Sequence, residues 1–224
     1  MPASKSGENV PLSRKVKREL LGWFWVVVAF LFIQGTMVQA RVIPSESMLK
    51  TLLIGDHVLV SRFGYDAGVP FTSWHISLWR QPERQQVIVF HPPLPDQPDY
   101  VKRVIGLPGD RVEIRAGSVW INGKPLIEPY LSETPDPSEN LGPYLVPPGN
   151  FFMMGDNRNN SSDSRRWGFV PRSSIVGSPV VIYLSVDSSG EAWQPGHLRE
   201  RMAAYGLALL HPGRVRWERL FVPF

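Results

Sequence analysis

The β character of this chain is clear in Tyr100-Val101-Lys102-Arg103-Val104-Ile105-Gly106-Leu107-Pro108-Gly109-Asp110. Its first six residues are mainly aromatic, β-branched or aliphatic, and a turn rich in glycine and proline follows, which is typical of a β-strand that ends at a turn. Similar short runs recur along the 224 residues and predict strands at residues 58–60, 86–90, 111–114, 118–121, 151–154 and 180–183. We therefore expect a mostly β fold in which short strands alternate with turns.

The segments between these runs favour a single irregular β-domain. Asn122-Gly123 follows the run at 118–121 and predicts a tight hairpin turn. Beyond the N-terminal region, only residues 195–210 favour a helix, and they do so weakly. A surface loop is expected at residues 136–143, which are rich in proline, glycine and polar side chains. Capped helices do not alternate with the strands, which argues against a doubly wound sheet.

The N-terminal region predicts a membrane anchor. Residues 20–40 contain no charged side chain, and as a helix they would span about 30 Å, the thickness of the hydrocarbon layer of a bilayer. The preceding residues carry five basic side chains against two acidic ones, which places the N-terminus in the cytoplasm. The sequence thus predicts a basic cytoplasmic tail at 1–19, a transmembrane anchor at 20–40 and an extracytoplasmic domain at 41–224.

Two features leave alternatives open. The N-terminal region also fits a cleaved signal peptide, because Val38-Gln39-Ala40 has small residues at the two positions that a cleavage site requires. Residues 63–79 have few charges and many aromatic side chains, which suit either contact with the membrane or ordinary packing against the core. These aromatic residues are Phe63, Tyr65, Phe71, Trp74 and Trp79.

Composition excludes several classes of site. The chain has no cysteine, which rules out disulfides and a thiolate nucleophile. Its five histidines form no close pair with metal-ligand spacing, so we expect no zinc site and no other metal or cofactor. The net charge of +4 is mild and lies partly in the N-terminal tail, so we expect no nucleic-acid partner.

The chemistry is indicated by Pro44-Ser45-Glu46-Ser47-Met48, which lies just after the apolar region. A serine hydroxyl is a poor nucleophile unless a neighbouring group takes its proton. No histidine stands in a motif that suggests a base, whereas Lys102 lies in an apolar strand. Burial can lower a lysine pKa from about 10.4 towards the range of 7 to 8 that suits a base. A single lysine in a strand is more commonly solvated, so Lys102 alone does not establish this role.

A third polar block, residues 155–165, follows the predicted strand at 151–154. It is dense in aspartate, asparagine, serine and arginine, which are side chains that bond to nearby backbone. One interpretation is a polar loop closed by its own hydrogen bonds. The other is a loop that orients the catalytic base through a hydroxyl group.

Taken together, the blocks resemble bacterial type I signal peptidase, a membrane-bound protease with a serine and lysine dyad. The resemblance runs in order through 44–52, 55–60, 102–110 and 155–165, and it includes Arg216-Trp217-Glu218-Arg219 near the end. It implies a twisted, mostly antiparallel β-domain that lies on the bacterial cytoplasmic membrane. It also implies removal of signal peptides from exported preproteins through an acyl-enzyme.

The resemblance assigns a role to each matching residue. Ser47 would be the nucleophile and Lys102 the general base. The Ser47 backbone N–H and the Ser45 hydroxyl would form the oxyanion hole. Supporting roles fall to residues that would orient the base or pair with one another, namely Ser161 on the Lys102 amine, Asp163 with Arg165, and Asp156 with Arg103.

The resemblance also implies the partners. The substrate would be a preprotein with small residues, typically alanine, at the −1 and −3 positions before the cut. Met48 and Ile43 are candidates for the wall of a shallow apolar pocket. We expect a monomer that contacts the lipid bilayer and needs no cofactor.

The chain departs from the family pattern at Lys50, where proline is typical, and at Asn159, where aspartate is usual. Lys50 creates Ser47-Met48-Leu49-Lys50, a Ser-x-x-Lys motif of the kind found in β-lactamases and penicillin-binding enzymes. That alternative lacks the companion Lys-Thr-Gly and Ser-Asp-Asn motifs and a helical domain. Lys50 could instead be a solvated side chain that raises the local positive potential near Lys102.

Two further alternatives belong to other classes of protein. The first is a non-catalytic anchored β-domain, although every proposed catalytic position is filled. The second is a self-cleaving repressor with a serine and lysine pair, which would need a DNA-binding helical domain in place of the anchor.

Overall fold

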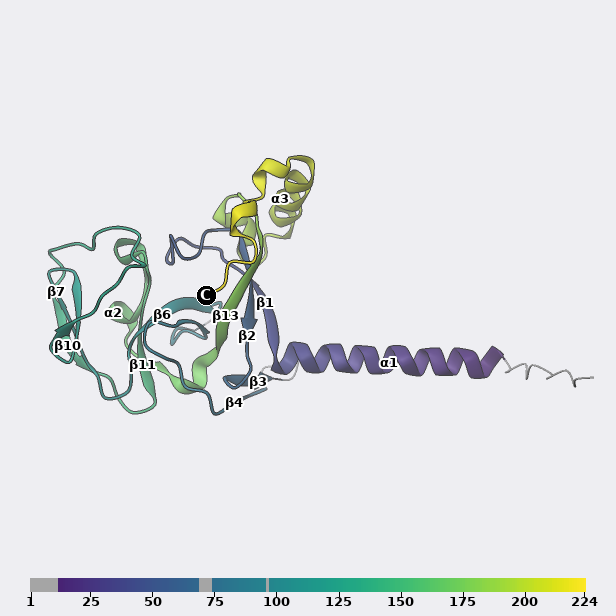
Figure 1. Cartoon of the computed structure of the whole chain (residues 1–224), viewed down its shortest axis with the longest axis horizontal. Helices are drawn as coiled ribbons and strands as arrows, with labels where there is room; N and C mark the ends of the chain where they lie inside the picture. The colour runs from purple at the N-terminus through teal and green to yellow at the C-terminus, as the bar shows by residue number, and fades with distance from the viewer. Residues whose placement is uncertain (1–11, 69–73, 96) are drawn as a thin grey trace, which may run out of the picture.

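Figure 1 shows the computed structural model of the chain, which describes residues 12–68, 74–95 and 97–224. A long helix, α1 (Leu12–Thr36), projects from one side of a β-rich domain, and α2 (Ser164–Trp167) and α3 (Leu198–Leu210) belong to that domain. The strands are β1 (Val38–Val42), β2 (Asp56–Ser61), β3 (Asp66–Gly68), β4 (His75–Ser77), β5 (Val87–Phe90), β6 (Tyr100–Gly106), β7 (Arg111–Arg115), β8 (Ser118–Ile121), β9 (Lys124–Pro125), β10 (Leu141–Leu145), β11 (Asn150–Met154), β12 (Val170–Pro171) and β13 (Ile175–Ser185).

The strands form one large sheet and two smaller ones, and every pair is antiparallel. The large sheet has the order β1-β2-β13-β5-β6-β11-β12, and the second has the order β10-β7-β8-β9. β3 and β4 pair separately as a hairpin. The prediction of a mostly β, antiparallel fold is therefore confirmed.

All seven predicted strands are present, with small differences at their ends. The long strand β13 extends the short run predicted at 180–183, and it links β2 to β5 in the large sheet. Asn122 and Gly123 both have positive φ angles, 51° and 80°, as a tight turn between β8 and β9 requires.

The loop expected at 136–143 is partly wrong. Leu141–Leu145 form β10, and Leu141 lies opposite Ile114 of β7. The prolines and glycines of this segment pointed to a loop, yet proline is tolerated in strands at the edge of a sheet. β10 is the terminal strand of its sheet, so Pro143 needs no partner on its outer side.

Three buried clusters form the core of the sheets. The first includes Ile43 and Met48, the second Phe90 and Phe151, and the third packs the β7–β8 hairpin against Phe152. β6 contributes to more than one of them, since Val104 belongs to the second cluster and Ile105 to the third. The central strand that carries Lys102 is therefore held rigidly from both faces.

The N-terminal region differs in its limits from the predicted segments. α1 begins at Leu12, inside the predicted basic tail, and ends at Thr36, while residues 38–40 belong to β1 and pair with β2. Residues 1–11 of the predicted tail lie outside the described part. Among the described residues, no helix combines the length and the apolar composition needed to cross a membrane.

The aromatic stretch at 63–79 divides into two environments. Tyr65 is completely buried in the second core cluster, whereas Trp74 and Trp79 are exposed and Phe63 is mostly exposed. Phe71 lies outside the described residues. Core packing thus accounts for Tyr65, and membrane contact by the exposed rings stays a prediction.

α3 confirms the helix predicted at 195–210, although it begins three residues later, at Leu198. In Figure 1 it lies beside the end of β13, away from the β7–β10 sheet. Ala204 and Ala208 pack with Trp193 and Val186 in a fourth buried cluster, so the helix uses small residues to approach the domain closely.

Candidate active site

Ser47 lies in a turn that follows β1 and is fixed at several points. Leu49 N–H donates to the Glu46 carbonyl at 2.9 Å, and Leu52 N–H donates to the Met48 carbonyl at 2.8 Å. The Met48 and Leu52 side chains are buried in the first core cluster. The turn therefore keeps the Ser47 hydroxyl at the surface while its neighbours on the chain are anchored below.

Lys102 comes from β6, 55 residues along the chain, and reaches the same point. Its Nζ donates to Ser47 Oγ at 2.5 Å. Only 4% of Lys102 is exposed. Its Nζ also lies 5.5 Å from the centre of the Tyr100 ring. The two residues predicted as nucleophile and base thus meet in direct contact.

Burial sets the protonation of Lys102. Loss of hydration is the largest cause that lowers its pKa from 10.5 to about 8, and the positive charge of Arg165 acts in the same direction. The negative charges of Asp163 and Asp156 oppose this shift but do not cancel it. A lysine with a pKa near 8 has an appreciable neutral fraction at neutral pH, which a general base needs.

Residues 155–165 support the nucleophile turn as well as the base. Asn157 N–H donates to the Ser47 carbonyl at 3.1 Å, and Asn157 Nδ2 donates to the Glu46 carbonyl at 3.2 Å. Gly155 packs so closely that a Cβ there would lie 2.4 Å from the Ser47 carbonyl oxygen and 2.3 Å from Ser161 Oγ. Only glycine fits beside the turn at this position.

Asp163 and Arg165 form the expected ion pair. Arg165 Nε and Nη2 donate to the two carboxylate oxygens of Asp163, each at 2.8 Å, and the Gly155 N–H adds a bond of 3.1 Å. Burial alone would raise the pKa of Asp163, but the hydrogen bonds and the charge of Arg165 outweigh it and lower that pKa. The ionised carboxylate thus ties the loop to itself close to Lys102.

The Arg103–Asp156 pair is present as well. Arg103 donates to both Asp156 oxygens, from Nε at 2.8 Å and from Nη2 at 2.6 Å. Thr51 Oγ1 donates to the same carboxylate at 2.5 Å, and the Tyr130 ring stacks 3.8 Å from the Arg103 guanidinium. This network joins β6, the turn after Ser47 and the 155–165 loop.

Ser161 is placed near the site but not bonded as expected. Among the described residues its buried hydroxyl makes no hydrogen bond, so it does not hold the Lys102 amine in this structure. It lies beside Gly155 and close to the Ser47 carbonyl, and it contributes to the lowered pKa of Asp163 without hydrogen-bond geometry. The orienting role assigned to Ser161 stays a prediction.

Two hydrogen-bond donors remain available beside the nucleophile. Ser45 Oγ lies 3.4 Å from Ser47 Oγ. Within the described part of the chain, the Ser47 N–H donates to no backbone or side-chain acceptor. A free N–H and a hydroxyl next to a nucleophile are the groups that an oxyanion hole requires.

A cleft of about 710 Å³ opens onto these residues. One wall is residues 40–48, and the other is residues 97–102. Ile43 and Met48, the predicted pocket residues, both line it. Trp193, Gln194 and Pro195 close a further side, which nothing in the sequence had indicated.

A second group of residues, not predicted from the sequence, also anchors the nucleophile turn. Arg219 Nη2 donates to Asp56 Oδ2 at 2.6 Å and to the Thr51 carbonyl at 3.0 Å, while Ser185 Oγ donates to Asp56 Oδ1 at 2.6 Å. Both Gly55-Asp56 and residues 216–219 match the family pattern. That joint match was the feature of the sequence that could have indicated their contact.

The Ser-x-x-Lys alternative is not supported by the geometry. Residues 47–50 form turns rather than a helix, and Lys50 has a φ angle of 77°. Its Nζ points to the carbonyls of Pro129 and Leu131, at 3.1 and 3.3 Å. Lys50 is also not among the charges that shift the Lys102 pKa, so the suggested effect on Lys102 was wrong.

No group of three or more histidine, aspartate or glutamate side chains in the described residues is arranged to hold a metal ion.

Asn159, the second departure from the family pattern, lies away from the dyad. Its Oδ1 accepts from the Asp136 N–H at 3.0 Å, and its Nδ2 donates to the Thr134 carbonyl at 3.2 Å.

Known proteins match this chain over most of its length. The family model described as "Signal peptidase, peptidase S26" matches residues 17–184. Signal peptidase I of Leptolyngbya laminosa is 40% identical over 200 residues, which cover 86% of this chain and 90% of that protein. Signal peptidase I of Pseudomonas fluorescens is 33% identical and covers 73% of this chain and 70% of its own.

A further relative is signal peptidase IB of Staphylococcus aureus, which is 37% identical and covers 72% of this chain and 88% of its own. Among solved structures, a signal peptidase I from Enterococcus faecalis V583 is 34% identical. It covers 44% of this chain and 97% of its own, with a TM-score of 0.39.

Proposed function

Since this chain belongs to the signal peptidase family, peptidase S26, and is a serine endopeptidase, we propose that a Ser47–Lys102 dyad in it removes signal peptides from exported preproteins. One observation carries the proposal. A lysine that is 96% buried, with a pKa of about 8, contacts the hydroxyl of a half-buried serine at 2.5 Å. Burial of this kind is what turns a lysine into a base.

The reaction follows from the positions of the two side chains. Neutral Lys102 takes the Ser47 proton, and Ser47 Oγ attacks the carbonyl carbon before the cut. The oxyanion that forms is stabilised by the Ser47 N–H and the Ser45 hydroxyl. When the peptide bond breaks, the Lys102 ammonium gives its proton to the leaving amine. A water molecule, deprotonated by Lys102, then attacks the acyl-enzyme and releases the signal peptide and free Ser47.

The ion pairs around the dyad hold its supporting segments in place and take no part in the proton transfers. Asp163 and Arg165 hold the 155–165 loop, whose Gly155 and Asn157 contact the Ser47 turn. Arg103 and Asp156 join the strand of Lys102 to Thr51, beyond the nucleophile. We assign Ser161 the role of contacting the Lys102 amine once substrate excludes water from the cleft. Its buried and unbonded hydroxyl supports that role.

The substrate is an exported preprotein with small residues at −1 and −3. Support comes from the cleft, whose wall next to Ser47 is built from the apolar side chains of Ile43 and Met48. A methyl group is accommodated by such a wall, whereas a charged side chain would lose hydration without a partner. We further propose that the enzyme acts as a monomer.

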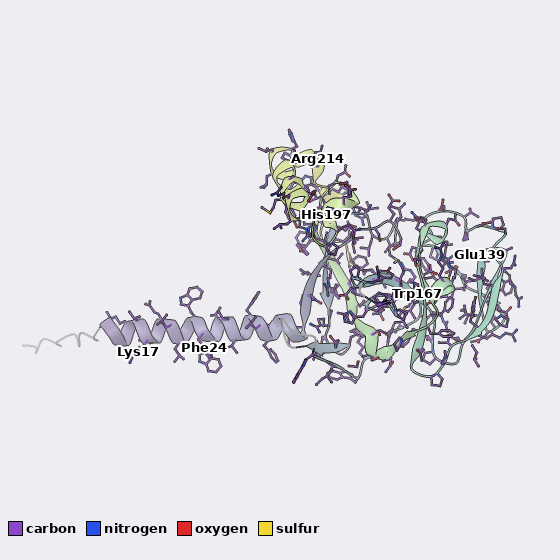
Figure 2. All side chains as sticks on the ribbon, turned by 180° about the vertical axis from the view of Figure 1, so that it is seen from behind. Lys17, Phe24, Glu139, Trp167, His197 and Arg214 are labelled. Atoms are coloured by element: carbon purple, nitrogen blue, oxygen red, sulfur yellow. The ribbon has the colours of Figure 1, made fainter. Side chains whose placement is uncertain are left out.

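We also propose that α1 anchors the enzyme in the bacterial cytoplasmic membrane, with the N-terminus inside and the β-domain outside, although its described residues fall short of the apolar composition of a spanning helix. The apolar side chains of residues 20–33 stand out all round the helix, and Figure 2 shows Phe24 among them, with Lys17 nearer the outer end. An apolar surface of this kind is unfavourable in water and favourable in lipid. Alkaline extraction of membranes tests this proposal, because an anchored chain stays with the lipid and a peripheral one is released.

The direct test is cleavage of a purified preprotein with an Ala-x-Ala site, in detergent. The wild type should release the mature protein with its N-terminus directly after the second alanine, as mass spectrometry would show. Ser47→Ala should release none, while Ser162→Ala, a neighbouring serine on the cleft, should remain active. A wild-type enzyme that leaves this preprotein intact would refute the proposed function.

A further inference from the structure

One side of the cleft is built by the C-terminal unit of the chain, which we define as residues 190–210. The unit consists of the 3₁₀-helix η3 (Gly190–Trp193) and α3, and it follows residues 17–184, which the family model matches. Trp193 and the two residues after it line the cleft. This side of the active site therefore comes from a part of the chain that lies beyond the family match.

Contacts with α3 hold η3 in place. Ala192 and Trp193 are almost completely buried and pack against the small side chains of α3 in the fourth core cluster. Arg201 of α3 donates to the carbonyls of residues 192, 193 and 194, at 3.4, 3.5 and 3.2 Å. The position of η3 is thus set by α3.

Tyr205 joins α3 to the large sheet through His57 of β2. His57 Nδ1 lies 2.9 Å from the Gly55 carbonyl, which can only accept, so this nitrogen carries the hydrogen. Burial lowers the pKa of His57, and the neutral ring therefore accepts at Nε2 from the Tyr205 hydroxyl, at 2.7 Å. Trp193 packs edge-on against the same ring, with the ring centres 5.0 Å apart. One histidine thus fixes both parts of the C-terminal unit to β2.

The first residue of η3 contacts the backbone just before the proposed oxyanion hole. A Cβ on Gly190 would lie 2.8 Å from the Pro44 carbonyl oxygen. This carbonyl and the Ser45 N–H belong to one peptide plane, so a movement of the first turns the second. No backbone N–H of the described residues donates to the Pro44 carbonyl. Packing against Gly190 is therefore what remains to orient this peptide.

Building on the proposed function, we propose that the C-terminal unit positions the oxyanion hole, with Gly190 as the positioning residue that acts through Ser45. The contact holds the Pro44–Ser45 peptide so that the Ser45 hydroxyl stays 3.4 Å from Ser47 Oγ. The oxyanion exists only along the reaction path, not in the bound substrate. A shift of Ser45 should therefore lower kcat and leave KM nearly unchanged.

The first variant adds one methyl group at this contact. Gly190→Ala forces the Pro44 carbonyl or η3 to move, because 2.8 Å is too close for a carbon and a backbone oxygen. We expect kcat to fall about tenfold, part of the ~10²–10³-fold that the loss of an oxyanion donor costs, and KM to change less than about twofold. Gly206→Ala is the matched control. It adds the same methyl group to α3, where nothing lies within 4 Å, and should keep the wild-type kcat and KM.

A double-mutant cycle with Ser45→Ala separates positioning from a loss of stability. Ser45→Ala should lower kcat by itself. If Gly190 acts through Ser45, then Gly190→Ala should cause almost no further loss in the Ser45→Ala enzyme. If Gly190→Ala only weakens the fold, the same loss should recur there. The four full-length enzymes are compared in detergent on the preprotein with an Ala-x-Ala site.

Tyr205→Phe makes a smaller change at the other end of the unit. It removes the hydroxyl that donates to His57, so a buried nitrogen loses its partner and α3 is held less firmly. Its kcat should fall by a smaller factor than that of Gly190→Ala, and again only when Ser45 is present. This variant, in the same cycle, decides the outcome if Gly190→Ala does not fold.

The results separate this inference from the function on which it rests. A folded Gly190→Ala enzyme with the wild-type kcat, a change in KM alone, or an equal loss with and without Ser45 would each overturn the inference and leave the proposed function intact. If Ser45→Ala keeps the wild-type kcat, the inference fails together with the role of Ser45 in the oxyanion hole. If the wild type leaves the preprotein intact, the proposed function itself fails.

Discussion

Two lysines flank the nucleophile, and the structure treats them in opposite ways. Lys50 is three residues from Ser47 in the chain, yet it is exposed and its Nζ bonds to the carbonyls of Pro129 and Leu131. Lys102 is 55 residues away, yet it is buried on β6 and contacts Ser47 Oγ at 2.5 Å. Proximity along the chain therefore does not select the base. The selection is made by a strand that carries one amine into an apolar site.

The backbone explains why the nearer lysine is turned away. Residues 47–50 turn sharply, and a φ angle of 77° at Lys50 directs its side chain away from Ser47. The strand β6, in contrast, is paired on both sides, with β5 and β11, and it delivers Lys102 from a fixed direction. The lysine on the turn bonds elsewhere and the lysine on the central strand reaches Ser47, so only the second can act as its base.

The largest expected effect is the loss of Lys102. Lys102→Ala removes the proton acceptor and should lower kcat by at least about 10²–10⁴-fold, the usual contribution of a general base. Lys50→Ala should retain nearly full activity. Cleavage of an Ala-x-Ala preprotein by both variants measures the contrast, and an active Lys102→Ala enzyme with an inactive Lys50→Ala enzyme would reverse it.

A smaller loss is expected when the loop beside the nucleophile is pushed away. Gly155→Ala places a Cβ 2.4 Å from the Ser47 carbonyl, so the turn must shift relative to Lys102. A displacement of about 1 Å costs on the order of 10²-fold in rate. Gly206→Ala is the matched control, because nothing lies within 4 Å of a Cβ in that position of α3.

The control should stabilise the protein slightly, by about 0.5–1 kcal/mol, because alanine is the better helix former. Activity assays and thermal unfolding of both variants distinguish the two effects. Equal activity in the two variants would show that the contact of Gly155 with the Ser47 turn has no catalytic role.

The pH dependence of the rate also distinguishes Lys102 from Lys50. The neutral form of Lys102 is the active one, so kcat/KM should rise about tenfold per pH unit below the pKa of about 8 and level off above it. Because the native pKa lies below that of the unfolded chain, the protein binds fewer protons than the unfolded state between about pH 8 and 10.5. Stability should therefore gain from Lys102 as the pH rises through that window.

The profile is measured with a short peptide substrate, and Lys50→Ala serves as the reference. The same midpoint in both enzymes assigns the titration to a group other than Lys50. A rate that falls as the pH rises from 6 to 9 would contradict a lysine base.

The smallest effect concerns Lys50 itself. Proline fixes φ near −65° and cannot adopt the angle of 77° seen here, so Lys50→Pro should destabilise the fold by about 1–3 kcal/mol. Lys50→Gly relieves the strain and should be neutral or stabilising by up to about 1 kcal/mol. Denaturant unfolding of the two variants measures the difference. If the proline variant is the more stable, the turn adopts another conformation.

Local pattern made much of this protein predictable. Apolar runs between turn residues indicated seven strands, and Asn122-Gly123 indicated its hairpin, because alternation and turn chemistry are properties of neighbouring residues. β10 was missed because Pro143 and Gly142 are turn residues in isolation. β1 was missed because its residues looked like the end of an apolar helix. Both strands owe their form to partners far along the chain.

The amino-acid sequence alone indicates which residues can do chemistry here: a serine in a turn, a lysine in an apolar run and a polar loop after a strand. Which of them meet depends on the folded chain, because burial and contact involve residues that are distant in the sequence. The folded chain selects Lys102 over Lys50, places Asn157 and Arg219 on the nucleophile turn, and sets Gly190 against Pro44. Desolvation of Lys102, the cause of its lowered pKa, exists only in that assembled site.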